Sequence, residues 1–170
     1  DPNSTEEVEA TSPSGDSIEA YNEFSEKQIV IDAKAILDSL FENKEDKSAQ
    51  EIEAELAAFC ADNQEFIVEL RNIAATGGPF HELDFSKGSK MELAPHLEQI
   101  RHWVRVLQKH GAMAAAKGDY EEATKDALAI AGFAEGIGKE PVLFSQMARG
   151  GLDGSIYNFI ADNMQGENLS

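Results

Sequence analysis

The sequence predicts an all-α domain of about six antiparallel helices, arranged as a bundle or as an irregular stack of α-hairpins. Apolar residues recur at helical spacing along most of the chain, glycine and proline interrupt the pattern, and no segment of four or more residues favours a strand. One domain is expected over residues 17–166. It would comprise acidic helices at 17–76, a loop at 77–92, and a helical hairpin plus a final helix at 93–165.

The acidic half of the domain contains the first helix signals. Residues 17–41 carry apolar residues at helical spacing, with a break or a phase shift of the apolar stripe in the middle. Ser48 and Glu51 form a capping-box pattern that predicts a helix start, and residues 62–65 repeat that pattern. The run 77–79, Gly-Gly-Pro, ends the last of these helices because it cannot continue one cheaply.

The second half has a more regular pattern. Apolar residues recur every three or four positions over 93–117, and Gly118 ends that helix. A capping pattern at 119–122 starts the next helix, which Gly138 ends, and the short link predicts an antiparallel hairpin. Pro141 opens a last helix. The side chains expected in the core are Trp103, Leu107, Ile130, Phe133, Leu143 and Met147.

Charge is distributed unevenly along the chain. Acidic residues number 32 and basic residues 14, a net charge of -18. Residues 1–70 hold 19 acidic and 4 basic residues, whereas residues 71–170 hold 13 and 10. This balance argues against a nucleic-acid partner, which needs a basic surface. No apolar run reaches the ~20 residues of a transmembrane helix.

The polar residues 1–16 are typical of a flexible leader that follows an export signal or a lipid anchor. A membrane tether before Asp1 would fit this interpretation. The basic stripe of Arg101, Arg105 and Lys109 either faces solvent or packs beside the acidic helices. The single cysteine, Cys60, is expected to be a small core residue.

Two resemblances follow from particular segments. The segment GDYEEATKDALAIAGFAE resembles one tetratricopeptide hairpin. Across residues 74–160, four features in order resemble a family of exported helical proteins of planctomycete-type bacteria: PFHELDFSKGS, LAPHLEQIRHWVRVL, AAAKGDYEEATKDALAIAGFAEGIGKEP and VLFSQMARGGLDG. This second resemblance implies a helical fold and an exported, periplasmic or envelope-associated location, with the cytoplasm as the alternative. It implies no catalytic residues.

The candidate ligand-site residues cluster around an aromatic loop at residues 80–90. They are His81, Glu82, Asp84 and His96, with His102 and Arg149 as further candidates. Converging carboxylate and imidazole groups could support acid–base chemistry or bind a small ligand. The structural alternatives are capping by the two carboxylates, a hydrogen bond from His96 to the preceding loop, and pairing of His102 with Glu98. Beside Arg149, the glycines at 150–151 favour close helix packing or a kink.

No metal or cofactor is predicted. His96 and His102 are six positions apart, so they point about 240° away from each other around a helix and cannot share one ion. Nucleophile-elbow and phosphate-loop motifs are absent from the sequence.

Three functions stay open. The first is a non-catalytic protein-interaction or scaffolding module with an exposed apolar or aromatic groove and a protein partner of unknown identity. The second is a small-ligand binder or enzyme that uses residues 80–96. The third is an acidic, cation-binding surface protein.

Overall fold

The computed structural model describes residues 13–42, 47–81, 95–140 and 143–163, and these ranges contain seven helices and no strand. The predicted all-α class is therefore confirmed. The helices are α1 (Pro13–Glu26), α2 (Gln28–Glu42), α3 (Ala49–Asp62), α4 (Gln64–Ala74), α5 (Pro95–Ala116), α6 (Tyr120–Gly138) and α7 (Leu143–Asn163).

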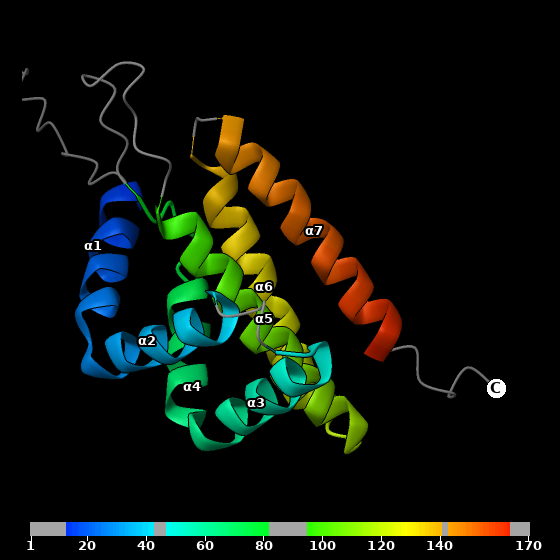
Figure 1. Cartoon of the computed structure of the whole chain (residues 1–170). Helices are drawn as coiled ribbons and strands as arrows, with labels where there is room; N and C mark the ends of the chain where they lie inside the picture. Colours follow the sequence, from blue (N-terminus) through cyan, green and yellow to red (C-terminus); the bar gives the residue numbers. More distant parts are fainter. Residues whose placement is uncertain (1–12, 43–46, 82–94, 141–142, 164–170) are drawn as a thin grey trace, which may run out of the picture.

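The helices form a long set and a short set. The long helices α5, α6 and α7 pack against one another, and α6 contacts both of the others. The shorter helices α1–α4 lie on the opposite side of α5 and α6 from α7 (Figure 1). No helix in the described ranges is both long enough and apolar enough to cross a membrane.

The predicted segment 17–41 is two helices, which accounts for the seventh element. Lys27 separates them, and its carbonyl accepts the backbone N–H groups of Val30 and Ile31 at 2.9 and 3.1 Å, as the residue before a helix does. α1 begins at Pro13, inside the expected leader, because proline needs no hydrogen bond in a first turn.

Local capping signals are confirmed for α3 and α6 but not for α4. Ser48 and Glu51 form the reciprocal capping box at the start of α3. The Asp119 side chain accepts the backbone N–H of Glu122 at 3.1 Å, which caps α6. The prediction for α4 was wrong: Asn63 precedes its first turn and makes no side-chain capping bond. The spacing of residues 62–65 matched a capping box by chance, because acidic residues are frequent in this half.

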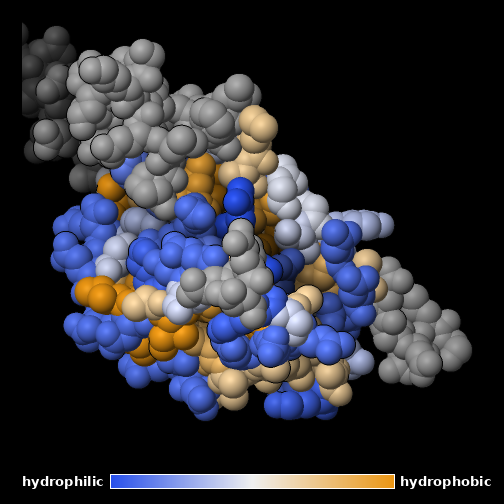
Figure 2. Space-filling model, viewed as in Figure 1, coloured by the Kyte–Doolittle hydropathy of each residue, from blue (hydrophilic) through white to orange (hydrophobic). Residues whose placement is uncertain are grey.

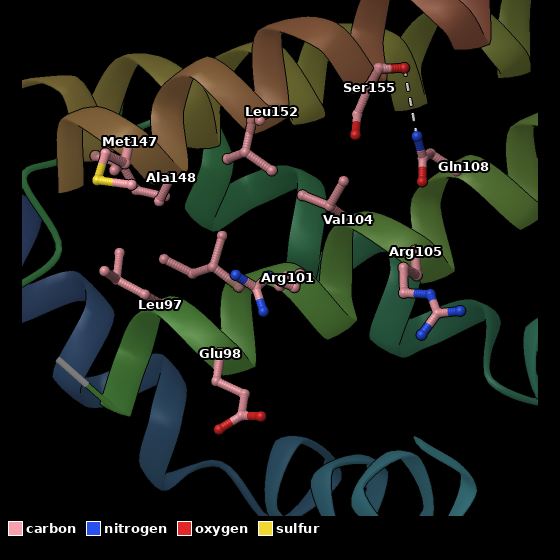
Figure 3. Close-up of a pocket in the computed structure, with 13 residues that line it drawn as sticks. Leu97, Glu98, Arg101, Val104, Arg105, Gln108, Met147, Ala148, Leu152 and Ser155 are labelled. Atoms are coloured by element: carbon pink, nitrogen blue, oxygen red, sulfur yellow. Dashed lines mark hydrogen bonds between the residues drawn. The ribbon is translucent and has the colours of Figure 1, made fainter. Parts of the chain in front are cut away.

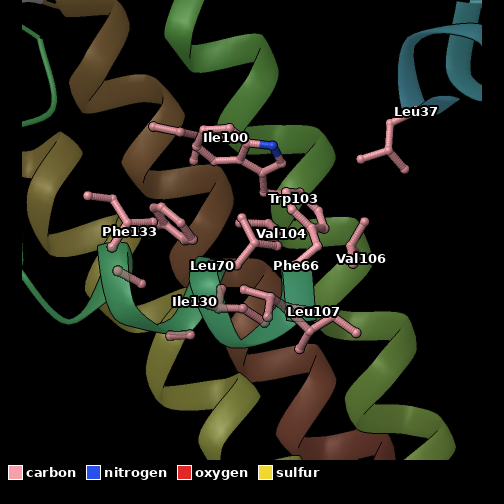
Figure 4. Close-up of a cluster of buried hydrophobic side chains, with 14 of the residues drawn as sticks. Leu37, Phe66, Leu70, Ile100, Trp103, Val104, Val106, Leu107, Ile130 and Phe133 are labelled. Carbon is pink, nitrogen blue, oxygen red and sulfur yellow. The ribbon is translucent and has the colours of Figure 1, made fainter. Parts of the chain in front are cut away.

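Trp103 of α5 lies at the centre of the core (Figure 4). Its ring packs edge-on against Phe24 with centroids 5.1 Å apart, and the rings of Tyr21 and Phe133 are each 5.9 Å away. These contacts join α1, α5 and α6. The predicted burial is confirmed for Trp103, Leu107, Ile130 and Phe133, which are all fully enclosed, while the side chain of Leu143 lies outside the described set.

The glycine-rich turn after α4 presses directly on α6. Gly77 and Gly78 have φ values of 64° and 54°, a left-handed conformation that favours glycine. Opposite this segment, a Cβ added at Gly132 would lie 2.3 Å from the carbonyl oxygen of Ala74, and one added at Gly136 would lie 2.2 Å from the ring of Phe80. Gly132 and Gly136 therefore allow α6 to approach the end of α4 and the segment after it closely.

Helix α7 differs most from expectation. Met147 was predicted to be buried, but its side chain is 65% exposed. Gly150 and Gly151 have open space where a Cβ would stand, so close packing against the described residues does not explain them. On the face shown in Figure 2, polar side chains cover most of the surface and apolar residues form smaller patches.

Candidate functional site

The sequence-predicted site residues separate into several places. The ring of His81 stacks on that of His96 with centroids 4.7 Å apart, so these two come together. Glu82 and Asp84 lie outside the described residues.

His96 belongs to a buried polar cluster, which we call the clasp and which consists of His96, Glu140 and Ser145. His96 Nε2 lies 2.9 and 3.0 Å from the two carboxylate oxygens of Glu140, and Ser145 Oγ donates to Glu140 Oε2 at 2.6 Å. Their exposed fractions are 5%, 1% and 0%. The clasp joins the first turns of α5 and α7 to Glu140, which follows the end of α6.

The clasp has the composition of a catalytic triad but not its geometry. A triad requires the nucleophile to contact the base, and here the serine and the histidine both contact the carboxylate instead. The loop to which His96 was expected to donate lies mostly outside the described residues. His96 Nε2 contacts Glu140, and His96 Nδ1 is buried with no hydrogen-bond partner among the described residues.

His102 and Arg149 lie away from the clasp. His102 Nδ1 lies 3.4 Å from Asp38 of α2, so the expected pairing with Glu98 was wrong. Its ring also packs on Phe41 with centroids 4.7 Å apart, because α2 crosses α5 at this point. Burial lowers the pKa of His102 more than Asp38 raises it. Arg149 pairs with Asp153 along α7 at 3.7 Å.

A groove lies between α5 and α7. Its volume is about 600 Å³, and Ile137 of α6 contributes to its lining. Leu97 and Val104 stand on the α5 wall, while Ala148 and Leu152 stand on the α7 wall (Figure 3). The exposed Met147 and the open position of Gly151 complete the α7 wall. We call this feature the α5–α7 groove.

Polar groups mark one end and one rim of the α5–α7 groove. The side-chain amide of Gln108 donates to the carbonyl oxygen of Ser155 at 3.3 Å, which joins the two walls (Figure 3). Arg101 and Arg105 line the α5 side one helical turn apart. The guanidinium of Arg105 lies 4.3 Å from the ring centroid of Phe41, and this cation–π contact holds its position.

A second buried charge cluster joins α4, α5 and α6. Arg71 Nε donates to Asp126 at 2.8 Å and its Nη1 donates to Glu122 at 2.7 Å, while His110 Nδ1 lies 2.7 Å from the other oxygen of Asp126. Hydrogen bonds from Lys125 and Arg71 lower the pKa of Glu122 to about 2. Asp126 is completely buried, so we interpret this cluster as a structural contact that holds α4, α5 and α6 together.

Neither the cysteine nor the acidic residues form a reactive centre in the described ranges. Burial raises the pKa of the Cys60 thiol to about 12, so the thiol stays protonated at neutral pH and is a poor nucleophile. The expectation of a core cysteine is confirmed, since Cys60 is fully buried. The described part of the chain contains no group of three or more His, Cys, Asp or Glu side chains that could hold a metal ion.

Sequence reasoning missed the position of the α5–α7 groove. The available signal was the mixture of small and apolar residues on α7, which we interpreted as a packing face. That mixture also fits a wall that another molecule can approach.

Comparison with known proteins gives no relative from which a role could be transferred. No family model, no curated protein and no solved structure matches the chain.

Proposed function

We propose that this protein is a non-catalytic protein-interaction module that receives a segment of a partner protein in the α5–α7 groove. The observation that carries the proposal is the exposed Met147 on the α7 wall of the groove. Met147 is 65% exposed, although most other large apolar residues of the long helices are buried. Methionine is flexible and polarizable, and it is common on surfaces that adapt to a partner.

The groove has the chemistry of a peptide-binding site. Its walls present Leu97, Val104 and Leu152 toward the intervening space (Figure 3). Concave sites that are mainly apolar and carry a few polar groups are the usual form of binding pockets. Two helices that wall such a groove are typical of proteins that bind an amphipathic helix.

An envelope location is part of this proposal. It is supported by the resemblance of residues 74–160 to exported helical proteins, and the cytoplasm is the alternative. The clasp does not favour an enzyme, because its serine and histidine do not contact each other.

Site-specific photo-crosslinking in the source cells tests the proposal. A photoreactive residue at Met147, which lines the groove, is expected to give a discrete adduct with one partner protein. The matched position is Tyr157 on the same helix, which is 74% exposed and lies outside the groove lining. No adduct at position 147 beyond that at position 157 would overturn the proposal.

A pair of glycine variants assigns the adduct to the groove. Gly151→Leu places a side chain in the groove, whereas Gly150→Leu changes the neighbouring residue outside the lining. A Cβ added at either position has no described atom within 4 Å, so both proteins should fold. The adduct should disappear with the first variant and persist with the second.

A further inference from the structure

We infer that the segment bound in the α5–α7 groove is an amphipathic helix of a partner protein that carries carboxylate side chains beside its apolar face. This inference rests on the proposed function, and it adds the chemistry of the partner.

The inference depends on which carboxylates Arg101 and Arg105 contact. Within the described ranges, every other basic side chain except Lys117 contacts a carboxylate within the chain. Neither Arg101 nor Arg105 forms an ion pair with a described residue, although the chain holds 32 acidic residues against 14 basic ones. Two arginines that form no ion pair with a described residue, both lining one groove, therefore complement an acidic partner.

The geometry also fits a helix. The α5 wall runs from Leu97 to Gln108, about 16 Å at 1.5 Å per residue, which corresponds to about three turns of a docked helix. Arg101 and Arg105 are four residues apart, so carboxylates spaced one turn apart on a docked helix can reach both. Glu98 also lines the groove, so the two arginines leave a net positive charge on the α5 side.

The open glycine explains how the partner approaches closely. Gly151 lines the groove, and no atom lies within 4 Å of the place where its Cβ would stand. A glycine in mid-helix costs about 0.5–1 kcal/mol relative to alanine, and no contact within the described chain offsets that cost. A helix backbone that lies over Gly151 would make use of the missing side chain.

The net charge does not prevent an acidic partner from binding. Residues 1–70 carry most of the acidic excess, and α1–α4 lie on the opposite side of α5 and α6 from α7 (Figure 1). At physiological ionic strength charges are screened over about 8 Å. The two arginines therefore dominate the interaction at the groove itself.

The test uses three stapled helical peptides of about three turns with one common apolar face. Two flanking positions, four residues apart, carry Glu, Gln or Lys. Fluorescence anisotropy at physiological salt measures the Kd of each peptide for the full chain. We expect the Glu peptide to bind about tenfold more tightly than the Lys peptide, as two exposed ion pairs would give. The double variant Arg101→Glu with Arg105→Glu should reverse this order.

Matched variants distinguish the effect of Arg101 and Arg105 from the effect of the overall charge of the protein. Lys117→Glu reverses another basic residue that forms no ion pair with the described residues but lies in the turn after α5, so it should leave the order of the peptides unchanged. Gly151→Leu should weaken all three peptides, and Gly150→Leu should weaken none. Circular dichroism confirms the fold of each variant.

The outcomes distinguish the two proposals. Binding of all three peptides with equal Kd, or a preference of the unmodified chain for Lys, overturns the acidic partner and leaves the groove as an interaction site. Absence of any binding, or binding that Gly151→Leu does not weaken, overturns the groove itself. Binding of dodecanoate by the chain with no binding of the Glu peptide identifies an amphiphile, and a dimer abolished by Gly151→Leu identifies a second copy. Either result contradicts the inference.

Discussion

At the residue scale, single glycines determine how closely the elements approach. Gly132 of α6 faces the carbonyl of Ala74, and Gly136 faces the ring of Phe80, so both allow contacts that a methyl group would prevent. Gly150 of α7 has no such neighbour. The same residue type therefore has opposite consequences on two neighbouring helices.

Gly132→Ala should destabilise the protein. Its Cβ would lie 2.3 Å from the Ala74 carbonyl oxygen, a backbone atom that can move only if the end of α4 shifts. Overpacking of this kind costs about 1–3 kcal/mol. Urea unfolding measures the loss, with Gly150→Ala as the control. The control should gain about 0.5–1 kcal/mol through helix propensity alone. Equal stability of Gly132→Ala and the unmodified protein would contradict the observed contact.

At the element scale, local signals predicted helices well and tertiary partners poorly. Ser48 with Glu51 marked the start of α3, because a capping box is complete within four residues. Glu140 contacts His96 across 44 residues, and no local pattern specifies such a contact. Helix α7 combines scattered apolar residues with several glycines, so periodicity could not decide which face is buried, and Met147 was assigned wrongly.

The candidate site was predictable only in part. Arg101 and Arg105 were recognisable as a stripe because their spacing places them on one helix face. Their lack of carboxylate partners among the described residues depends on where the acidic helices pack, which no spacing in the sequence specifies. Lys109, the third member of the stripe, does meet an acidic helix, since its Nζ lies 2.8 Å from Glu53 of α3.

The ion pair between Arg71 of α4 and Glu122 of α6 should make the free energy of unfolding depend on pH. The folded-state pKa of Glu122 is about 2, lowered from the ordinary 4.5. Its contribution to the free energy of unfolding is therefore complete above pH 4.5 and is lost as the pH falls toward 2. Glu122→Gln should be less stable than the unmodified protein at pH 7, and the difference should shrink over that interval.

Urea unfolding at a series of pH values measures this dependence. Glu121→Gln is the control, because Glu121 is 85% exposed and contacts only Lys125 at 3.2 Å. Its stability should follow that of the unmodified protein at every pH. A constant difference between Glu122→Gln and the unmodified protein from pH 7 to pH 2 would contradict the assignment.

At the scale of the whole molecule, charge and apolar surface are segregated. The first 70 residues, which include α1–α3 and most of α4, carry 19 acidic and 4 basic residues. The α5–α7 groove lies in the more balanced half and is lined by Arg101 and Arg105, which form no ion pair with a described residue. The two halves contribute to one hydrophobic core around Trp103, although their surfaces differ in charge.

Mutual repulsion among the acidic residues should make stability sensitive to salt. A net charge of -18 opposes the compact state, and added salt screens this repulsion. Raising NaCl from about 10 to about 200 mM should raise Tm by about 2–4 °C, equivalent to roughly 1 kcal/mol for a chain of this size. Differential scanning calorimetry measures the shift.

Neutral substitutions on α1 provide the comparison. Asp16→Asn, Glu19→Gln and Glu23→Gln together remove three exposed carboxylates, and their combined variant should respond less to salt. A fall in Tm with added salt would mean that screened ion pairs outweigh the repulsion.

The contacts at the two ends of the α5–α7 groove have a further consequence. The clasp fixes the first turns of α5 and α7 to the end of α6, and the bond from Gln108 to Ser155 fixes the same two helices farther along. The separation of the walls is thereby set during folding, before any partner arrives. A preorganised receptor loses little conformational entropy on association, so most of the ordering cost would fall on the incoming helix.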